Sequence, residues 1–164
     1  MRCGKDPINR VRAARTFEQY TAAYDSGNPR IALKIDHTLR VAALCERIAT
    51  SVGLPPDDVD LAWLLGLVHD IGRFEQVRRY DSFNDSSTMD HAALGVETLF
   101  GTHDGQEPLI RLFSGDESYD APIRVAVGTH SAFRLPKGID ARTRVLCEVL
   151  RDADKIDILK VNCT

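Results

Sequence analysis

The chain has 164 residues, of which 43% are hydrophobic and 27% are charged, and its formal net charge is −3. This composition excludes a disordered, fibrous or strongly basic nucleic-acid-binding protein, and it is typical of a single globular domain, which we expect to span residues 1–164. No apolar run reaches about 18 residues and the first residues form no apolar leader, so we expect a cytoplasmic protein without membrane segments.

Two amphipathic helices are predicted in the first third of the chain. Apolar residues recur at helical spacing from about Asn9 to Tyr24 and, more strongly, from residue 31 to 52, where Gly53 ends the pattern. In the second helix His37 lies near the apolar side, whereas Arg40 is expected to point away from it. This helix therefore brings a histidine to the edge of the core.

A third helix is predicted to follow the turn at residues 55–58 and to run to about Ile71. Its residues 61–68 are almost all apolar and can lie only in a core, yet the run ends in the adjacent pair His69 and Asp70. Removing a carboxylate from water costs several kcal/mol unless a cation or strong donors compensate. A metal ion is the simplest partner for this pair.

The helical pattern loosens beyond this pair. The polar segment 80–89 indicates either an ordered loop over a site or a solvated connection. Asp90 or Thr88 is then expected to cap a helix that runs to about Phe100 and carries His91 in its first turn. A second imidazole is thus expected at a helix start.

Three further helical segments complete the predicted fold. A short one covers 109–113, the next covers 122–130 and ends in His130, and the last runs from about Ala141 toward Asp157. Few stretches alternate with period two, so the fold class is predicted to be all-α, as one compact helical domain. The helical pattern continues almost to the last residue, so truncation of a longer C-terminal portion stays open.

Imidazoles and carboxylates recur at or near the ends of these helices. In chain order they are His37, His69, Asp70, His91, His130 and Asp154. Side chains from several helices can converge on a metal in a helical core without breaking backbone hydrogen bonds. Nitrogen and oxygen ligands without thiolate suit a divalent transition metal such as Mn, Fe, Co, Ni or Zn, and Mg less well. The adjacency of His69 and Asp70 suits a carboxylate that bridges two ions, and the sequence leaves open whether one ion or two are bound.

Three short sequence motifs occur in order along the chain. They are IDHTLRVA at residues 35–42, VHDIGRFE at residues 68–75 and RDADKID at residues 151–157. Together they resemble the HD-domain superfamily of metal-dependent phosphohydrolases, and the resemblance covers roughly residues 30–160. Joined motifs in the right order are far more specific than a lone His-Asp pair.

The resemblance implies a fold, a ligand set and a reaction. The fold is all-helical, and one ion is held by the residues that match the family's ligands, which are His37, His69, Asp70 and Asp154. In the branch with two ions, His91 and His130 hold the second ion and Asp70 bridges. The reaction is hydrolysis of a phosphoester in a nucleotide or related small phosphate by metal-activated water.

Three residues are predicted to be catalytic in this reaction. Asp70 is the shared ligand, and Arg73 and Lys155 are predicted to bind the phosphate of the substrate. Arg73 follows Asp70 by three residues and Lys155 is next to Asp154, so backbone proximity would hold both cations beside the metal. Arg73 and Lys155 could instead be ordinary surface charges.

Less specific interpretations of single residues also stay open. His91 could simply cap a helix, and His130 could be a helix-end cation favoured by the dipole. Glu75 could act on protons, complete the coordination, or only pair with Arg78 or Arg79 on a helical turn.

Two other functions fit the same residues. One is an HD-type di-iron oxygenase, and the other is a non-catalytic HD module that binds a nucleotide or a metal. Metal analysis and oxygen consumption would separate the oxygenase from the hydrolase. The expected partner is a small-molecule phosphate, without duplex nucleic acid or a membrane, and a homo-oligomer is left open.

Overall fold

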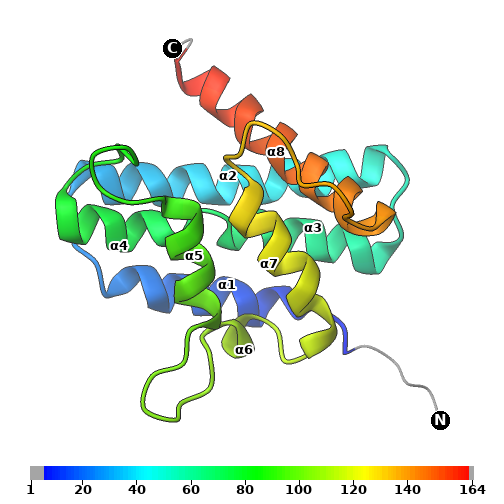
Figure 1. Cartoon of the computed structure of the whole chain (residues 1–164), viewed down its shortest axis with the longest axis horizontal. Coiled ribbons are helices and arrows are strands. Elements are labelled where there is room, and N and C mark those ends of the chain that lie inside the picture. The colour runs from blue at the N-terminus through cyan, green and yellow to red at the C-terminus, as the bar shows by residue number, and fades with distance from the viewer. Residues whose placement is uncertain (1–5, 163–164) are drawn as a thin grey trace.

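The computed structural model describes residues 6–162 of the chain, so residues 1–5 and 163–164 of the expected domain lie outside the described part. No strand occurs among the described residues, which confirms the predicted all-α fold. The elements (Figure 1) are α1 (Arg10–Ala22), α2 (Pro29–Ser51), α3 (Pro56–Val68), α4 (Ile71–Tyr80), α5 (His91–Phe100), α6 (Ile110–Phe113), the 3-10 helix η1 (Glu117–Tyr119), α7 (Asp120–Thr129) and α8 (Ala141–Asn162).

The helices are arranged around α2 and α3. One side of α2 packs along α3 and another packs against α8, while α5 contacts both α4 and α7. Figure 1 shows α1, the row formed by α3 and α4, and α2 lying roughly parallel, with α5 and α7 crossing over them. Segments that are far apart in the sequence therefore meet where these rows cross.

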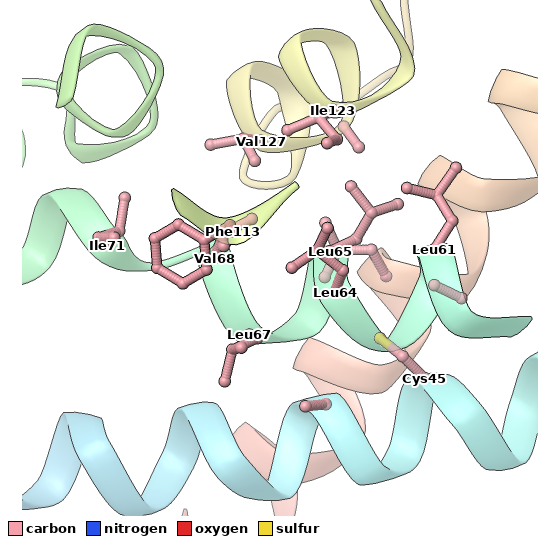
Figure 2. Close-up of a cluster of buried hydrophobic side chains, with 14 of the residues drawn as sticks. Cys45, Leu61, Leu64, Leu65, Leu67, Val68, Ile71, Phe113, Ile123 and Val127 are labelled. Atoms are coloured by element: carbon pink, nitrogen blue, oxygen red, sulfur yellow. The ribbon is translucent and has the colours of Figure 1, made fainter. Parts of the chain in front are cut away.

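From residue 61 to residue 68, helix α3 is apolar on all sides because other helices enclose it there. Leu61, Leu64, Leu65 and Leu67 are fully buried. In Figure 2, Leu67 points toward α2 while the other labelled leucines point toward Ile123 on α7. Burial of each leucine contributes about 2 kcal/mol. The apolar run predicted to lie only in a core is therefore confirmed as the centre of the fold.

Close packing of α2 on α3 depends on a glycine. A Cβ added to Gly66 would lie 2.6 Å from Cα and 2.8 Å from the backbone nitrogen of Ala42, closer than real side chains allow. The missing side chain lets the two backbones approach. As a result the ring centroids of His37 on α2 and His69 after α3 lie only 5.4 Å apart.

The central helix is shorter than predicted. It was expected to run to about Ile71, but α3 ends at Val68, and Asp70 has non-helical backbone angles, with φ −104° and ψ 16°. In a regular helix, neighbouring side chains point about 100° apart around the axis. The break at Asp70 changes this angle, so the side chains of His69 and Asp70 can both face one point. The apolar pattern did not reveal the break because Ile71 is itself buried at the start of the next helix.

Helix α4 was not predicted, since the pattern was expected to loosen there. Its buried face includes Glu75 and Gln76, which are 8% and 0% exposed. Both look solvent-facing in the sequence, but hydrogen bonds with Tyr24 and Asp85 satisfy them. Helix α4 ends where Asp81 adopts a left-handed conformation with φ 48°.

The other predicted helices are confirmed within a few residues at their ends. Of the two candidate caps for α5, Asp90 is the one used, because its Oδ1 accepts a hydrogen bond from the backbone nitrogen of Ala92 at 2.9 Å. Within the described residues, no helix is long and apolar enough to cross a membrane.

Candidate metal centre

The six residues predicted as metal ligands lie together in the structure. They come from five different elements: His37 from α2, His69 and Asp70 from the break between α3 and α4, His91 from the start of α5, His130 from the end of α7, and Asp154 from α8. Overlapping groups of three among them bring one possible ligand atom from each residue within 4.8 Å of the others. The break after α3 and the ends of α5 and α7 thus face the middle of α2 and α8.

One oxygen of Asp70 belongs to a first half of this centre, which we define as His37, His69, Asp154 and Asp70 Oδ2. The Nε2 atoms of His37 and His69 each lie 3.5 Å from Asp70 Oδ2. The same two nitrogens lie 3.0 and 3.4 Å from Asp154 Oδ1. Two imidazoles and two carboxylate oxygens therefore surround one point.

The other oxygen of Asp70 belongs to a second half, which we define as His91, His130 and Asp70 Oδ1. Nε2 of His91 lies 3.5 Å and Nε2 of His130 lies 3.4 Å from Asp70 Oδ1. The two Nε2 atoms are 3.0 Å from each other. Asp70 is thus placed between two pairs of imidazoles, as a bridging carboxylate would be.

All four imidazoles turn the same nitrogen toward the centre. Each Nδ1 lies within hydrogen-bond distance of an oxygen outside the centre: Asp157 Oδ2 for His37 at 2.7 Å, Gly66 O for His69 at 2.7 Å, Asp85 Oδ2 for His91 at 2.5 Å, and Val127 O for His130 at 2.7 Å. Carboxylates and carbonyls only accept, so each Nδ1 carries the proton. In the neutral form of each ring, Nε2 then offers a lone pair to the centre, which is the state that metal binding requires.

The buried polar atoms of the first half fit a cation. Nε2 of His37, Nε2 of His69 and Oδ1 of Asp154 are buried and have no hydrogen-bond partner, because their short mutual distances lack hydrogen-bond geometry. Leaving three such atoms unpaired in a core is costly. A metal ion bound by the three atoms would remove that cost, so the donor set and its burial both fit one.

The carboxylates of the centre are charged at neutral pH. Burial alone would raise the pKa of Asp70, but the nearby imidazole of His69 and the ammonium of Lys34 hold it well below its usual range. Burial likewise opposes ionisation of Asp154, yet His37 and His69 lower its pKa. Deprotonated carboxylates are the form that binds metal.

The two carboxylate-supported imidazoles respond differently to their surroundings. Burial lowers the pKa of His91, which keeps the ring neutral at neutral pH. Burial acts the same way on His37, but the Asp154 and Asp70 carboxylates outweigh it and raise its pKa. The first half therefore attracts positive charge more strongly than the second.

Lys34 is a member of the centre that the sequence did not reveal. Its Nζ donates a hydrogen bond to Asp70 Oδ2 at 2.8 Å and lies 5.1 Å from the ring centroid of Phe83. It precedes His37 by three residues on α2, a spacing that places both on one face of the helix. That spacing was the one available signal, and it gains meaning only once His37 is known to face the site.

Charged residues outside the centre hold ligand side chains in place through hydrogen bonds. Asp157 is 1% exposed and accepts hydrogen bonds from His37 and from Nε of Arg40, the latter at 2.7 Å. The prediction that Arg40 points away from the apolar side of α2 missed this contact. Asp157 was assigned no role from the sequence, because a contact between residues 117 or more positions apart leaves no periodic pattern.

The polar segment before α5 is an ordered loop over the site rather than a solvated connection. Asp85 accepts from His91 and, through its other oxygen, from Nη1 of Arg73 at 2.8 Å. Nη1 of Arg73 also donates to Gln76 Oε1 and to the backbone oxygen of Phe83, each at 2.8 Å. Arg73 is therefore engaged with this loop, and its contact with phosphate stays a prediction.

The remaining candidates lie outside the centre. Lys155 is an exposed residue of α8 beside Asp154, and its role toward substrate also stays a prediction. Glu75 accepts hydrogen bonds from Tyr24 and Arg79, each at 2.9 Å, and from Arg78. The pairing interpretation of Glu75 is therefore the one the structure supports.

The fold and the centre together define an all-helical protein whose interior gathers four imidazoles and two carboxylates around a candidate site for one or two metal ions. The model of the HD domain family matches residues 35–159. The match covers most of the chain, so the chain belongs to the HD domain family, within the superfamily of HD metal-dependent phosphohydrolases. Searches of curated proteins and of solved structures gave no match.

Proposed function

We propose that this protein is a metal-dependent hydrolase of a phosphoester in a nucleotide or a related small phosphate. The observation that carries the proposal is the position of Asp70, with one pair of Nε2 atoms beside each of its two oxygens. A carboxylate placed in this way is suited to hold two cations at a fixed separation. Membership of the HD domain family supports the same reaction class.

The residues that would hold the ions follow from the two halves of the centre. His37, His69, Asp154 and one oxygen of Asp70 would hold the first ion, and His91, His130 and the other oxygen would hold the second. This nitrogen and oxygen set suits Mn, Fe, Co, Ni or Zn better than Mg. When bound, such ions polarise a phosphoryl oxygen and make water acidic enough to act as a nucleophile.

The chain itself contributes charge and orientation. The Lys34 ammonium is only 2.8 Å from Asp70, so it can offset negative charge on a phosphate brought to the ions. Burial of the imidazoles lowers the local dielectric and strengthens these interactions. We propose Lys155 and Arg73 as further phosphate contacts, and for Arg73 this requires donors other than Nη1, which is shared among three acceptors.

The direct test is a turnover screen. The metal-stripped protein is reconstituted with Mn, Fe, Co, Ni, Zn and Mg in turn, and each form is assayed against nucleoside mono-, di-, tri- and cyclic phosphates and against sugar phosphates. We expect phosphate release with at least one ion and no release from the Asp70→Ala variant. Absence of turnover with every ion and substrate class would refute the proposal.

An iron-dependent oxygenase is the second candidate, because the four-histidine, two-aspartate set without thiolate also suits iron. Oxygen uptake by the iron form, with no phosphatase activity under any ion, would favour it. Nucleotide binding without turnover by a metal-free protein would instead favour a non-catalytic module.

A further inference from the structure

The two halves of the centre differ in direct negative charge. The first half places two carboxylate oxygens, from Asp70 and Asp154, beside its imidazoles, whereas the second half places only one, from Asp70. Cation affinity falls as the number of charged ligands falls. The second half therefore depends more on whatever strengthens its imidazoles.

Asp85 is placed to make His91 a stronger metal ligand. Its Oδ2 lies 2.5 Å from His91 Nδ1, and its Oδ1 accepts from Nη1 of Arg73 at 2.8 Å and from Nε2 of Gln76 at 3.0 Å. Both oxygens are thus engaged, and the carboxylate can turn only by breaking these bonds. A carboxylate behind an imidazole fixes the ring's orientation and makes its free nitrogen a better ligand.

The same two side chains fasten the loop that carries Asp85. Gln76 is fully buried on α4, and its Nε2 also donates to Oγ1 of Thr88 at 2.9 Å. Arg73 bonds the backbone oxygen of Phe83, as described above. The loop from residue 81 to 90 is therefore attached to α4 at the points that also hold Asp85.

We propose that Asp85 is a positioning residue for the second metal ion, and that through His91 it sets the affinity of the second half without changing that of the first. Because the Asp85 side chain is 35% exposed on a loop, the second ion is the weaker and more exchangeable of the two. The inference rests on the metal centre invoked in the proposed function, but not on the reaction. Removing such an outer partner weakens metal affinity by about 10–100-fold.

The test is a Mn²⁺ titration of the metal-stripped protein without substrate, followed by calorimetry and by electron paramagnetic resonance. We expect two binding steps in the wild type and the spectrum of a coupled ion pair at saturation. In Asp85→Asn the weaker step should shift by about 10–100-fold, the tighter step should stay, and an isolated-ion spectrum should persist to higher Mn²⁺ concentration.

Two further variants make the test specific. Asp81→Asn makes the same chemical change on the same loop, at an exposed residue that pairs with Arg30 and whose left-handed backbone asparagine tolerates. It should bind both ions as the wild type does. Asp85→Glu keeps the charge but displaces the acceptor, so its weaker step should fall between those of the wild type and Asp85→Asn.

Three results would overturn the inference: a single binding step in the wild type, equal weakening of both steps in Asp85→Asn, or the same weakening in Asp81→Asn. The thermal unfolding temperature of each ion-free variant shows whether the fold is intact, and Asp85→Glu carries the test should Asp85→Asn prove unstable. Because no substrate is used, a protein without phosphatase activity still gives a decisive result.

Discussion

The two halves of the candidate centre share Asp70 and a common plan. In each half one imidazole is held by a carboxylate and the other by a backbone oxygen three residues earlier in the chain, Gly66 O for His69 and Val127 O for His130. The backbone-held imidazoles follow directly from the end of a helix, where carbonyl groups lack intrahelical partners. These two imidazoles are therefore held without any additional side chain.

The carboxylates that hold the other two imidazoles are placed very differently. Asp157 is 1% exposed on α8 and is fixed by Arg40, whereas the Asp85 side chain is 35% exposed on the loop before α5. Helix packing thus fixes the first half, and hydrogen bonds to a loop fix the second. The comparison teaches that one centre can combine a rigid ion site with an adjustable one, because stability is not uniform across a fold.

Loss of the shared residue should have the largest effect, because it removes a ligand from both halves. Asp70→Ala should abolish metal content, and His69→Ala should abolish binding at the first half. Each should lower turnover by about 1000-fold or more, since metal catalysis supplies several kcal/mol. Metal analysis and the turnover screen measure this, and the helical circular dichroism spectrum should stay nearly intact. Wild-type activity in either variant would remove the basis of the assignment.

A matched pair of glycine substitutions should disturb the two halves separately. A Cβ at Gly66 would overlap the backbone of Ala42 and push α2 from α3, beside the first half. A Cβ at Gly72 would overlap the backbone oxygen of His91 and lie 2.6 Å from the nitrogen of Gly95, beside the second half. Each alanine variant should lower the free energy of unfolding by about 1–3 kcal/mol or more, as measured by urea denaturation.

The metal content of these variants separates the halves. Gly66→Ala should weaken the first ion more, and Gly72→Ala should weaken the second. Gly128→Ala on α7 is the control, because its Cβ would meet only a side-chain methyl of Val96 at 3.4 Å. Identical metal-binding profiles for Gly66→Ala and Gly72→Ala would show that the halves are not supported independently.

Replacement of the buried outer carboxylate should have a moderate effect. Asp157→Asn keeps the shape but removes the charge that holds His37 and pairs with Arg40, so the affinity for the first ion should fall by about 10–100-fold. Mn²⁺ titration measures the change. Asp152→Asn, an exposed residue of the same helix, should leave both steps unchanged, and an unaltered tighter step in Asp157→Asn would contradict the role given to Asp157.

The smallest effect should lie outside both halves and concerns acid stability. Burial opposes ionisation of Glu75, but Arg78, Tyr24 and Arg79 hold its pKa below the ordinary value of 4.5. A carboxyl group with a lowered folded-state pKa stabilises the fold above its unfolded pKa, and that contribution is lost as pH falls through the folded pKa. Glu75→Gln should therefore flatten the fall in unfolding free energy of the metal-stripped protein below about pH 4.5.

The control for this measurement is Glu148→Gln, an exposed position on α8. It should follow the wild-type curve of unfolding free energy against pH, as measured by urea denaturation in acid. If Glu75→Gln also follows that curve, the prediction is wrong. The acid sensitivity of the fold then arises from other groups, and the carboxylates of the centre are the next candidates.

Much of the fold was predictable because the buried face of a helix requires apolar residues at a regular spacing in the sequence. The apolar run at residues 61–68 and the amphipathic stretch at 31–52 gave α3 and α2 directly. Helix α4 was missed since its buried face includes Glu75 and Gln76, which hide that spacing. A polar residue is predicted from the sequence to be exposed. Only the structure shows the hydrogen-bond partner that allows it to be buried.

The ligand candidates were also predictable, because histidines are few and occur in the order of the family's motifs. The prediction that every candidate lies at or near a helix end was wrong for His37 and Asp154, which lie in the middle of α2 and α8. Lys34, Asp85 and Asp157 were not predictable, since lysines and aspartates are common on helix faces and loops. What distinguishes these three is a contact with a single imidazole or with Asp70. Such contacts join residues up to 120 positions apart, and no local pattern records them.

The amino-acid sequence alone determined that the chain forms helices, which of them lies in the core, and which imidazoles and carboxylates are candidates for metal binding, because these follow from the spacing of apolar residues and from residue chemistry. Only the tertiary structure decided where α3 breaks, which oxygen of Asp70 faces which imidazoles, and which carboxylate supports each ring. The physical reason is that spacing is a property of the chain, whereas the direction of a lone pair is set by a partner that packing brings from elsewhere.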